Sequence, residues 1–306
     1  MNVLIMLTLP PERCSDGRWE WEFDLEPTLA AVLEAIPDAT VGRVHGEAPE
    51  MIEWLARERP DVVFNLCEAP LCNPRLEPHA AALFEWLRVP FTGSSSETLA
   101  ICRRKDVTKR LLSAAGLPVP RSDVYPCIVK PLAEDGSAGI RDDSICENPA
   151  DVERAVARLD SPALVEEFLA GREFVVTMWG KAAPEESVVA EVAFTSGVRL
   201  LTYEGKWDTE SHVYVNAPLT FPDDLEPQLR RRLLDIAAGT WRAVGLRGYA
   251  TVDLRLDDEG TPRVIDVNPN PALNAEGRVY RATERAGWPW QQFVTRQLEW
   301  AHTYGS

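Results

Sequence analysis

Largely apolar runs and helical patterns alternate along the first third of the chain. Residues 3–7 and 62–66 each form a short run rich in Val, Leu, Ile and Phe, which is typical of buried strands. Residues 26–36 and 76–87 carry apolar side chains at helical spacing. A strand followed by a helix, twice over, predicts an α/β domain, which we place at residues 1–95.

A long helix is predicted next, from a capping box to a glycine. Ser94 and Glu97 stand at capping-box spacing, and Gly116 precedes a Leu-Pro-Val-Pro segment that cannot continue a helix. Five cations fall close together within this helix: Arg103, Arg104, Lys105, Lys109 and Arg110. They form either a surface that faces phosphates or an ordinary solvated helix face, and the spacing fits both.

The middle of the chain combines strands with a loop of small residues. A strand is predicted at residues 127–131, with Lys130 near its end. The segment 134–140 then contains Gly136, Ser137 and Gly139, whose backbone N–H groups suit phosphate oxygens. It is not a Walker A loop, because no Gly-Lys-Ser/Thr follows at the start of a helix. We place this central subdomain at residues 96–175.

Two glutamates lie near the point where the next two strands, 164–169 and 173–179, are expected to join. Glu166 and the backbone beside it suit the edge of an adenine ring, and Glu173 suits ribose hydroxyls. Glutamates at a turn between strands are also commonly just solvated. Both interpretations stay open at this point.

The stretch from residue 248 to residue 273 predicts a hairpin that ends in polar residues. Apolar and polar residues alternate on both sides of an acidic turn at 257–260. A four-residue connection there predicts that Asp253 lies across from Asp266, with Asn268 on the same face. Two facing carboxylates repel unless a cation lies between them, and three oxygen ligands of this kind suit Mg²⁺. The alternative is a solvated hairpin face.

The remaining C-terminal residues complete a subdomain that we place at 176–306. Its other elements are predicted at residues 187–195, as a strand, and at 225–244 and 284–300, as helices. Between them, a polar loop over 203–211 carries Lys206. Three tryptophans near the end, Trp288, Trp290 and Trp300, fit either a packed core or an interface between two subunits.

Charge and cysteine usage narrow the classes of function. The 306 residues include 48 acidic and 32 basic ones, a net charge of −16, which argues against nucleic acids and anionic membranes as partners. An anionic nucleotide can still bind where metal and lysines gather. No run approaches 18 apolar residues, so no membrane span is predicted. Six cysteines without CxxC spacing predict reduced thiols and a cytoplasmic protein.

Taken together, these motifs resemble the ATP-grasp superfamily, in particular its D-alanine–D-alanine ligase branch. The residues that carry the resemblance span about 60 to 275: Lys105, Val129-Lys130-Pro131, the 134–140 loop, Val165-Glu166-Glu167-Phe168, Gly171-Arg172-Glu173-Phe174, Val252-Asp253 and Ile265-Asp266-Val267-Asn268-Pro269. Several motifs in the family's order and spacing are more specific than any one of them. The resemblance implies an α/β and α+β protein with the ATP-grasp fold, in which three subdomains hold ATP between two antiparallel sheets.

The resemblance also implies roles around the nucleotide. The residues that would contact ATP are Lys105, Lys130, Gly136, Ser137, Gly139, Glu166, Leu169, Glu173 and Lys206. Of these, Lys130 and Lys206 would be catalytic, because their charges would neutralise the phosphoryl group during transfer. Asp253, Asp266 and Asn268 would carry one or two Mg²⁺ ions, with Mn²⁺ as a substitute.

The part of the chain that would bind substrates departs from the family pattern. Thr251 stands where the family has an arginine that supports the developing oxyanion, and a hydroxyl cannot replace that charge. Asp266 stands where glutamate is usual, Glu68 where histidine is typical, Gly136 where serine is usual, and residues 271–274 replace a Pro-Gly and serine segment. We therefore expect substrates other than two D-alanines.

Charged residues outside the ATP motifs are the candidates for binding those substrates. Glu68 would pair with an ammonium group, and Arg13, Arg18 or Arg278 would pair with a carboxylate. The leading hypothesis is an ADP-forming carboxylate–amine ligase for amino acids or a small peptide, which works as a monomer or as a homodimer. The alternatives are an ATP-binding protein without turnover and an ATP-grasp ligase that modifies peptides.

Overall fold

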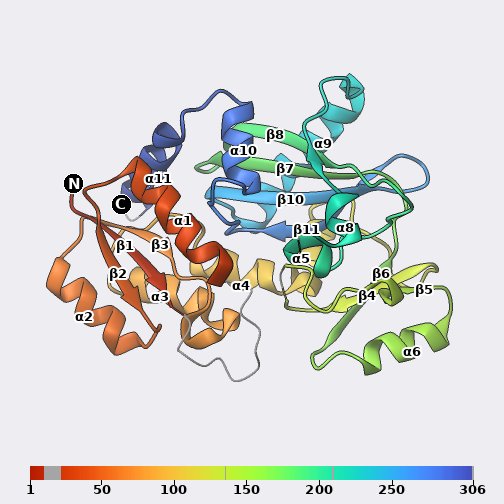
Figure 1. Cartoon of the computed structure of the whole chain (residues 1–306), viewed down its shortest axis with the longest axis horizontal. Coiled ribbons are helices and arrows are strands. Elements are labelled where there is room, and N and C mark those ends of the chain that lie inside the picture. The colour runs from red at the N-terminus through yellow and green to blue at the C-terminus, as the bar shows by residue number, and fades with distance from the viewer. Residues whose placement is uncertain (10–21, 135, 209, 305–306) are drawn as a thin grey trace.

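The N-terminal part of the chain is a small parallel sheet covered by helices. The computed structural model describes residues 1–9, 22–134, 136–208 and 210–304. The strands β1 (Val3–Thr8), β2 (Thr40–Val44) and β3 (Val62–Leu66) pair in parallel in the order β2-β1-β3. The helices of this layer are α1 (Glu22–Ala35), α2 (Ala48–Glu58) and α3 (Glu77–Trp86) (Figure 1). The predicted α/β layer is confirmed.

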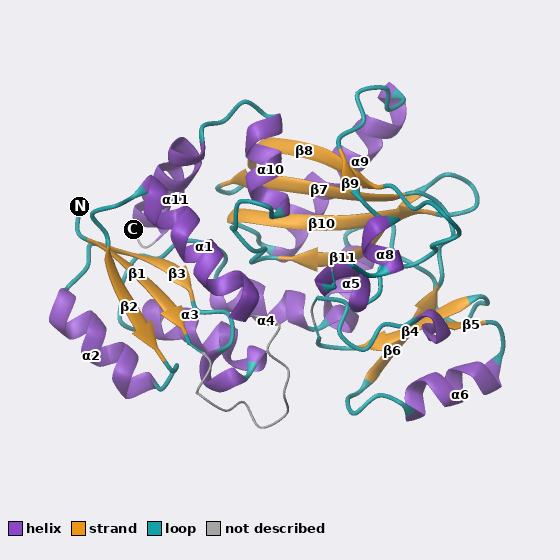
Figure 2. Cartoon of the chain, viewed as in Figure 1, coloured by secondary structure: helices purple, strands orange, loops and turns teal. Residues whose placement is uncertain are grey.

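A second, antiparallel sheet forms a separate lobe, which we call the small sheet. It consists of β4 (Cys127–Pro131), β5 (Ile145–Cys146) and β6 (Ala163–Glu167), in the order β5-β4-β6. Helix α6 (Pro149–Ala157) lies along the small sheet (Figure 2), and its Ala155 packs against Cys127, Val129 and Cys146. The other face carries Ile128, which packs against Phe168 and Leu200. This apolar face is turned toward the rest of the molecule.

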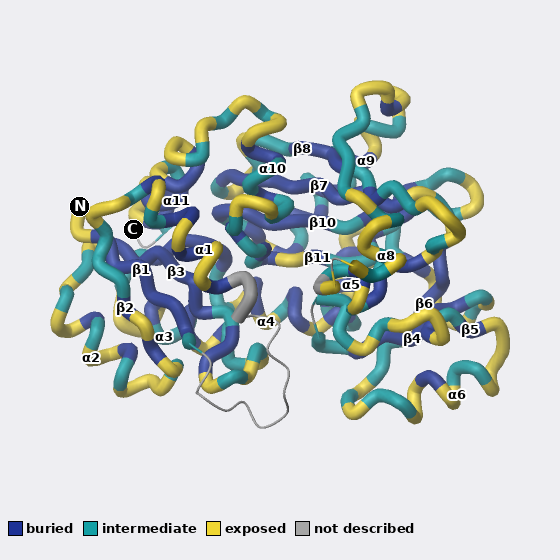
Figure 3. The backbone as a smooth tube through the Cα atoms, viewed as in Figure 1, coloured by how far each residue is buried: buried dark blue, intermediate teal, exposed yellow. Residues whose placement is uncertain are grey.

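A five-stranded antiparallel sheet, the large sheet, occupies the centre of the C-terminal part. Its order is β11-β10-β7-β8-β9, and its strands are β7 (Glu173–Gly180), β8 (Pro184–Val192), β9 (Leu219–Thr220), β10 (Gly248–Leu256) and β11 (Pro262–Asn268). Helix α9 (Pro227–Val244) packs on it through Leu233, Ala237 and Trp241. The strands are mostly buried, and the exposed residues lie chiefly on the outer helices and loops (Figure 3). The expected boundary at residue 175 lies within β7.

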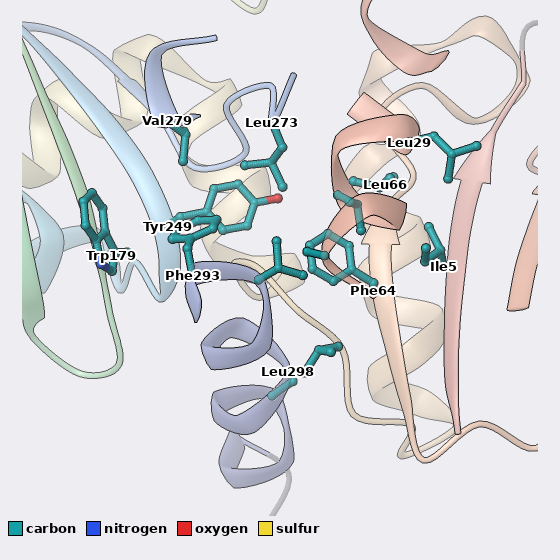
Figure 4. Packing of buried hydrophobic residues seen from close by; sticks show 14 of the residues in the cluster. Ile5, Leu29, Phe64, Leu66, Trp179, Tyr249, Leu273, Val279, Phe293 and Leu298 are labelled. Carbon is teal, nitrogen blue, oxygen red and sulfur yellow. The ribbon is translucent and has the colours of Figure 1, made fainter. Parts of the chain in front are cut away.

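One apolar core joins the N-terminal layer to the large sheet. Ile5, Phe64 and Leu66 from the parallel sheet belong to the same cluster as Trp179 and Tyr249 from the large sheet, with helix α11 (Trp290–Tyr304) between them (Figure 4). Trp300 is buried in this core, and Trp288 and Trp290 pack against it. The C-terminal tryptophans therefore serve packing within the chain.

Two helices that were predicted as continuous are each broken. The first is split at Arg104 into α4 (Ser96–Arg103) and α5 (Lys105–Ala114), because the Arg104 backbone is not helical (φ −93°, ψ 87°). Its cap is Ser95, whose hydroxyl accepts from the N–H of Thr98, and not Ser94, whose hydroxyl donates to the carbonyl of Arg247. The final helix is likewise two, α10 (Arg278–Arg285) and α11.

The remaining short elements complete the chain. They are the 3₁₀ turns η1 (Pro70–Cys72), η2 (Pro74–Leu76) and η3 (Asp142–Ser144), and the helices α7 (Glu204–Trp207) and α8 (His212–Val215). Within the described residues, none of the helices has the length and apolarity that crossing a bilayer requires.

The cysteines differ from the prediction at one position. Cys67, Cys102, Cys127 and Cys146 are free and buried. Cys72 is disulfide-bonded, so the prediction of six reduced thiols is wrong there. Sequence spacing missed it, because the fold can bring together cysteines that no CxxC motif connects. Cys14 lies outside the described residues.

Candidate active site

A pocket opens between the small sheet and the large sheet. One group of its lining residues is apolar: Ile128, Phe168, Leu169, Leu200, Leu201 and Ile265. A second group is charged: Lys105, Lys130, Glu134, Glu166, Glu167, Glu173, Lys206, Asp253, Arg255, Asp266 and Arg278. An apolar slot beside clustered charges suits a ligand with a flat apolar end and a charged end. Most residues predicted to contact ATP lie here.

The hairpin of β10 and β11 supplies two facing carboxylates through a bulge. Asp253 pairs with Asp266 in the register, as predicted, but the connection has five residues, 257–261, rather than four. The register shifts after Asp253, because Leu254 pairs with Val264 and leaves Ile265 as an extra residue. The bulge therefore restores the pairing that the longer connection would have displaced.

The bulge also leaves a backbone carbonyl that accepts a hydrogen bond from a lysine. The unpaired carbonyl of Ile265 accepts from Lys130 Nζ at 3.1 Å, and Lys130 Nζ lies 2.8 Å from Glu166 Oε1. Lys130 comes from β4 in the small sheet, so this contact links the two sheets. The lysine is buried and fixed in place at the pocket wall.

The break between α4 and α5 turns a second lysine toward the hairpin. At this break, the N–H of Lys105 donates to the carbonyl of Leu132 at 3.3 Å, so the helix restarts beside the small sheet. Lys105 Nζ then donates to both carboxylate oxygens of Asp266, at 2.9 and 3.1 Å. Burial opposes the charge of Asp266, but Lys105 and Lys130 together hold the pKa of that carboxyl well below its usual range. Asp266 is thus a carboxylate.

Glu166 joins two buried lysines. Its carboxylate lies 2.8 Å from Lys130 Nζ and 2.8 Å from Lys109 Nζ. Lys109 Nζ also donates to the carbonyl of Val264 at 3.2 Å. Although burial works against it, the two lysines lower the pKa of Glu166. We call Lys109, Glu166 and Lys130 the buried triad; the predicted contact of Glu166 with adenine stays a prediction.

The five cations predicted on this helix point in two directions, some into the protein and some to the surface. Arg103, Lys105 and Lys109 are buried and point inward, whereas Arg104 and Arg110 pair with Asp106 on the surface. Arg103 Nη1 donates to the carbonyl of Ala133, next to the 134–140 loop, at 3.0 Å. The solvated helix face is confirmed for Arg104 and Arg110, whereas a phosphate-facing surface stays a prediction for the residues that point inward.

The far end of the pocket holds a second set of ion pairs. Arg278 Nη1 donates to Asp253 at 3.0 and 3.1 Å, and Arg255 Nη1 lies 3.4 Å from Glu173 Oε2. Burial raises the pKa of Glu173, which Arg255 opposes. Lys206, from α7, lines the same end of the pocket. Glu173 thus lines the same pocket as Arg255, which lies 82 positions later in the sequence, and Arg278, which lies 105 positions later.

The remaining predicted site residues lie in different places. Ser137 and Leu169 line the pocket, whereas Gly136 and Gly139 lie on the same loop outside the lining and take positive φ values of 65° and 73°. Asn268 is exposed, and its side-chain oxygen accepts from the N–H of Asn270 at 2.9 Å. Glu68 is not part of the lining, Thr251 is buried, and Arg13 and Arg18 lie outside the described residues.

A divalent cation fits part of this donor set. Asp253 and Asp266 face each other across the ladder and line the pocket, where they pair with Arg278 and Lys105, and their oxygens would be ligands for a cation bound there. In the described residues, no three His, Cys, Asp or Glu side chains gather as a metal site, so any further ligand must be of another kind, such as an amide, water or phosphate. Asn268 stays the predicted third ligand.

Some site residues were missed from the sequence. Lys109 was noted only as a cation on a helix, and Arg255 was read as the polar partner of an alternating strand. Arg255 is buried between Phe168 and Phe194, with its guanidinium carbon 5.1 Å from each ring centroid. A charged residue inside an otherwise apolar strand was the available signal, because such a residue needs a buried partner.

The ion pair of Glu167 with Arg121 gives a testable dependence of stability on pH. Glu167 Oε1 accepts from Arg121 Nε at 3.0 Å, and this bonding lowers the pKa of the carboxyl from its ordinary 4.5, against the effect of burial. Because the folded-state pKa is depressed, the pair stabilises the fold fully above pH 4.5, and this contribution is lost as the pH falls through the lowered pKa. We expect Glu167→Gln to cost about 1 kcal/mol at pH 7.

The measurement is urea unfolding at a series of pH values. The difference between the wild type and Glu167→Gln is expected to shrink below pH 4.5. Glu153→Gln, on the exposed side of α6, is the control and is expected to change little at any pH. A difference that is constant across the whole series would contradict the assigned pair.

Comparison with known proteins gives concordant results. Residues 101–299 match the family model described as D-ala D-ala ligase C-terminus. An uncharacterized protein of Sinorhizobium fredii, y4sG, is 33% identical over 260 residues, which is 79% of this chain and 74% of that protein. A D-alanine–D-alanine ligase of Cupriavidus necator is 26% identical over 228 residues, 69% of this chain and 68% of the ligase.

A solved structure has the same architecture. The D-alanine–D-alanine ligase of Bacillus anthracis, crystallised with ATP, has a TM-score of 0.73 to this chain at 14% identity. The likeness covers 100% of this chain and 98% of that one. At this identity it shows the fold alone, and the predicted ATP-grasp fold is confirmed.

Proposed function

Because this chain belongs to the D-alanine–D-alanine ligase family, we propose that it is an ADP-forming carboxylate–amine ligase that joins amino acids or a small peptide. The observation that carries the proposal is the pocket between two antiparallel sheets. There Lys105, Lys130 and Lys206 lie with the facing carboxylates Asp253 and Asp266. Lysines suit phosphate oxygens, and paired carboxylates suit the cation that accompanies them.

ATP supplies the activation that amide formation needs. A carboxylate is a poor electrophile, so one of its oxygens attacks the γ-phosphorus, and the bond from phosphorus to the β-phosphate oxygen breaks to release ADP. The product is an acyl phosphate. Lys105 and Lys130, both buried and fixed by ion pairs, would bind the phosphate oxygens during this transfer. The apolar slot beside Phe168 and Leu169 would receive the base.

The amine then completes the reaction. Its nitrogen adds to the acyl carbon, the carbon–oxygen bond to phosphate breaks, and the nitrogen loses a proton to the departing phosphate. The chain's main contribution is to hold the reactants together and to exclude water, which would hydrolyse the acyl phosphate. Ser137, Ala138 and Lys206, which line the pocket, would help to cover the reactants. A divalent cation held by Asp253 and Asp266 would neutralise phosphate charge.

The substrates are proposed to differ from two D-alanines. Thr251 offers a hydroxyl where the family resemblance leads us to expect an arginine, and Arg278 stands in the pocket as an additional cation. Side chains that orient a substrate's carboxylate and ammonium decide which amino acid fits, because an unpaired charge in a pocket is costly. A different set of charges therefore favours a different pair of substrates.

The test is to measure ADP and phosphate released from Mg·ATP in the presence of pools of D- and L-amino acids and dipeptides. Release that depends on the added pool, with a condensed product in mass spectrometry, is the expected result. Lys130→Ala is the negative control, because it removes a side chain that we propose binds phosphate. Tight ATP binding without turnover on any pool would favour the alternative of a nucleotide-binding protein.

A further inference from the structure

Arg278 and Arg255 are the two arginines that line the pocket in the described part of the chain, and Arg278 comes from outside the large sheet. The residue opens α10, directly after the cap residue Gly277, and its side chain extends to β10. Its Nη1 donates to both carboxylate oxygens of Asp253, at 3.0 and 3.1 Å. The side chain is 25% exposed and lines the pocket beside Lys206. Arg278 therefore faces the space where reactants bind.

Some N–H donors of the Arg278 guanidinium have no hydrogen-bond acceptor among the described residues. A guanidinium carries five N–H donors in one plane. In the described ranges, Nη1 serves Asp253, and no side chain or carbonyl accepts from Nε or Nη2. Two lysines of the pocket, by contrast, are each held by a carboxylate: Lys105 by Asp266 and Lys130 by Glu166. The free edge of Arg278 is thus available to an anionic group.

The other cation of the neighbouring strand, Arg255, is already bound to Glu173 and to the carbonyls of Gly171 and Arg199. Thr251 lies two residues before Asp253 on β10, hence on the same face, and it is buried with only a hydroxyl to give. Asp253 itself is negative and would repel a carboxylate. Its ion pair with Arg278 offsets that charge and anchors the guanidinium through Nη1. The end of the pocket is thereby made suitable for a substrate carboxyl group.

We propose that Arg278 is a catalytic residue of this ligase, which binds the reacting carboxyl group of the substrate with the donors that Asp253 leaves free. The inference rests on the proposed function. While one carboxyl oxygen attacks the γ-phosphorus and ADP leaves, Arg278 holds the other oxygen. When the amine adds, the carbonyl electron pair moves onto that oxygen, and it returns as the bond to phosphate breaks. A fixed guanidinium stabilises this charge.

The test compares Arg278→Gln with Arg285→Gln. Arg285 lies two turns along the same helix on the surface, so its substitution is the matched control. With the amino acid that supports turnover in the pool experiment, we expect Arg278→Gln to lower kcat/KM for the carboxylate substrate about 100-fold. The Kd of Mg·ATP, measured by calorimetry, is expected to stay unchanged in both variants.

Two further measurements distinguish a catalytic role of Arg278 from a purely structural one. Binding of the same amino acid to the protein with Mg·ADP, which cannot react, is expected to weaken in Arg278→Gln. Free guanidinium ion is expected to restore part of the turnover of Arg278→Ala. Arg278→Lys keeps a charge beside Asp253 but lacks the planar fork, so it is expected to stay impaired and to gain nothing from guanidinium.

The outcomes are distinguishable. Unchanged kcat/KM and unchanged amino-acid binding in Arg278→Gln, with an active wild type, would overturn the assignment of Arg278 alone. Loss of Mg·ATP binding in parallel with loss of turnover would also overturn it, because Arg278 would then act on the nucleotide or on the fold. No turnover of the wild type on any pool would instead contradict the proposed function.

Discussion

Replacing Asp266 by Asn is expected to lower ADP formation about 100-fold or more. Asp266 faces Asp253 across the ladder and accepts from Lys105 Nζ at 2.9 Å, so its charge connects the proposed cation site to a lysine that we propose binds phosphate. The amide keeps the shape of the side chain but removes that charge, and a lost electrostatic group in an active site costs two to three orders of magnitude, roughly 2.7–4 kcal/mol. Acceptor-dependent ADP release measures it.

The control for this prediction lies on the same hairpin. Asp258→Asn makes the same chemical change in the exposed turn between β10 and β11, where no pocket residue is affected. It is expected to retain full turnover. A Mn²⁺ titration followed by electron paramagnetic resonance gives a second readout: Asp266→Asn is expected to bind Mn²⁺ with ATP more weakly. Equal activity and equal Mn²⁺ binding in the two variants would remove Asp266 from the site.

Replacing Glu166 by Ala is expected to destabilise the fold by about 3 kcal/mol. The carboxylate lies 2.8 Å from both Lys109 Nζ and Lys130 Nζ, and the three side chains are 6%, 11% and 9% exposed. Removing it leaves two neighbouring ammonium groups buried without their common partner, and breaking a buried ion pair in this way costs 3–5 kcal/mol. We use the lower end of this range because the lysines can release a proton. Urea unfolding measures the change.

A surface ion pair provides the matched control. Glu299→Ala removes one of the two partners of Arg296 on α11, where the side chains of Glu299 and Arg296 are 54% and 42% exposed, and we expect a loss of at most about 1 kcal/mol. The double variant Glu166→Ala, Lys109→Met is expected to be more stable than Glu166→Ala alone, because it removes one unpaired charge. If Glu166→Ala and Glu299→Ala destabilise equally, the buried triad does not contribute as the geometry indicates.

The sequence predicted the elements whose pattern is local. Apolar runs located β1 and β3, and the alternation on both sides of the acidic turn located β10 and β11. The facing of Asp253 and Asp266 was predicted correctly but for an incomplete reason, since the connection is one residue longer and the bulge at Ile265 restores the register. A bulge leaves no periodic signal, because it changes the pairing of one residue only.

The helix breaks were not predictable from local pattern. Helix-forming residues continue on both sides of Arg104, and the break depends on the N–H of Lys105 reaching the carbonyl of Leu132 in the small sheet. The same holds for the final helix, which ends at Arg285 and restarts at Trp290 so that α10 and α11 pack on different parts of the core. Contacts distant in sequence override propensity in both cases.

The amino-acid sequence by itself determined which residue types this protein brings to phosphate and cation chemistry, and the order in which its strands and helices occur. Only the tertiary structure decided the partners: Lys105 with Asp266, 161 positions away, Glu166 with two lysines, and Arg278 with Asp253. The physical reason is that periodicity reports the burial of a face, which is local. Which charge neutralises another in a pocket depends on how separate sheets pack together.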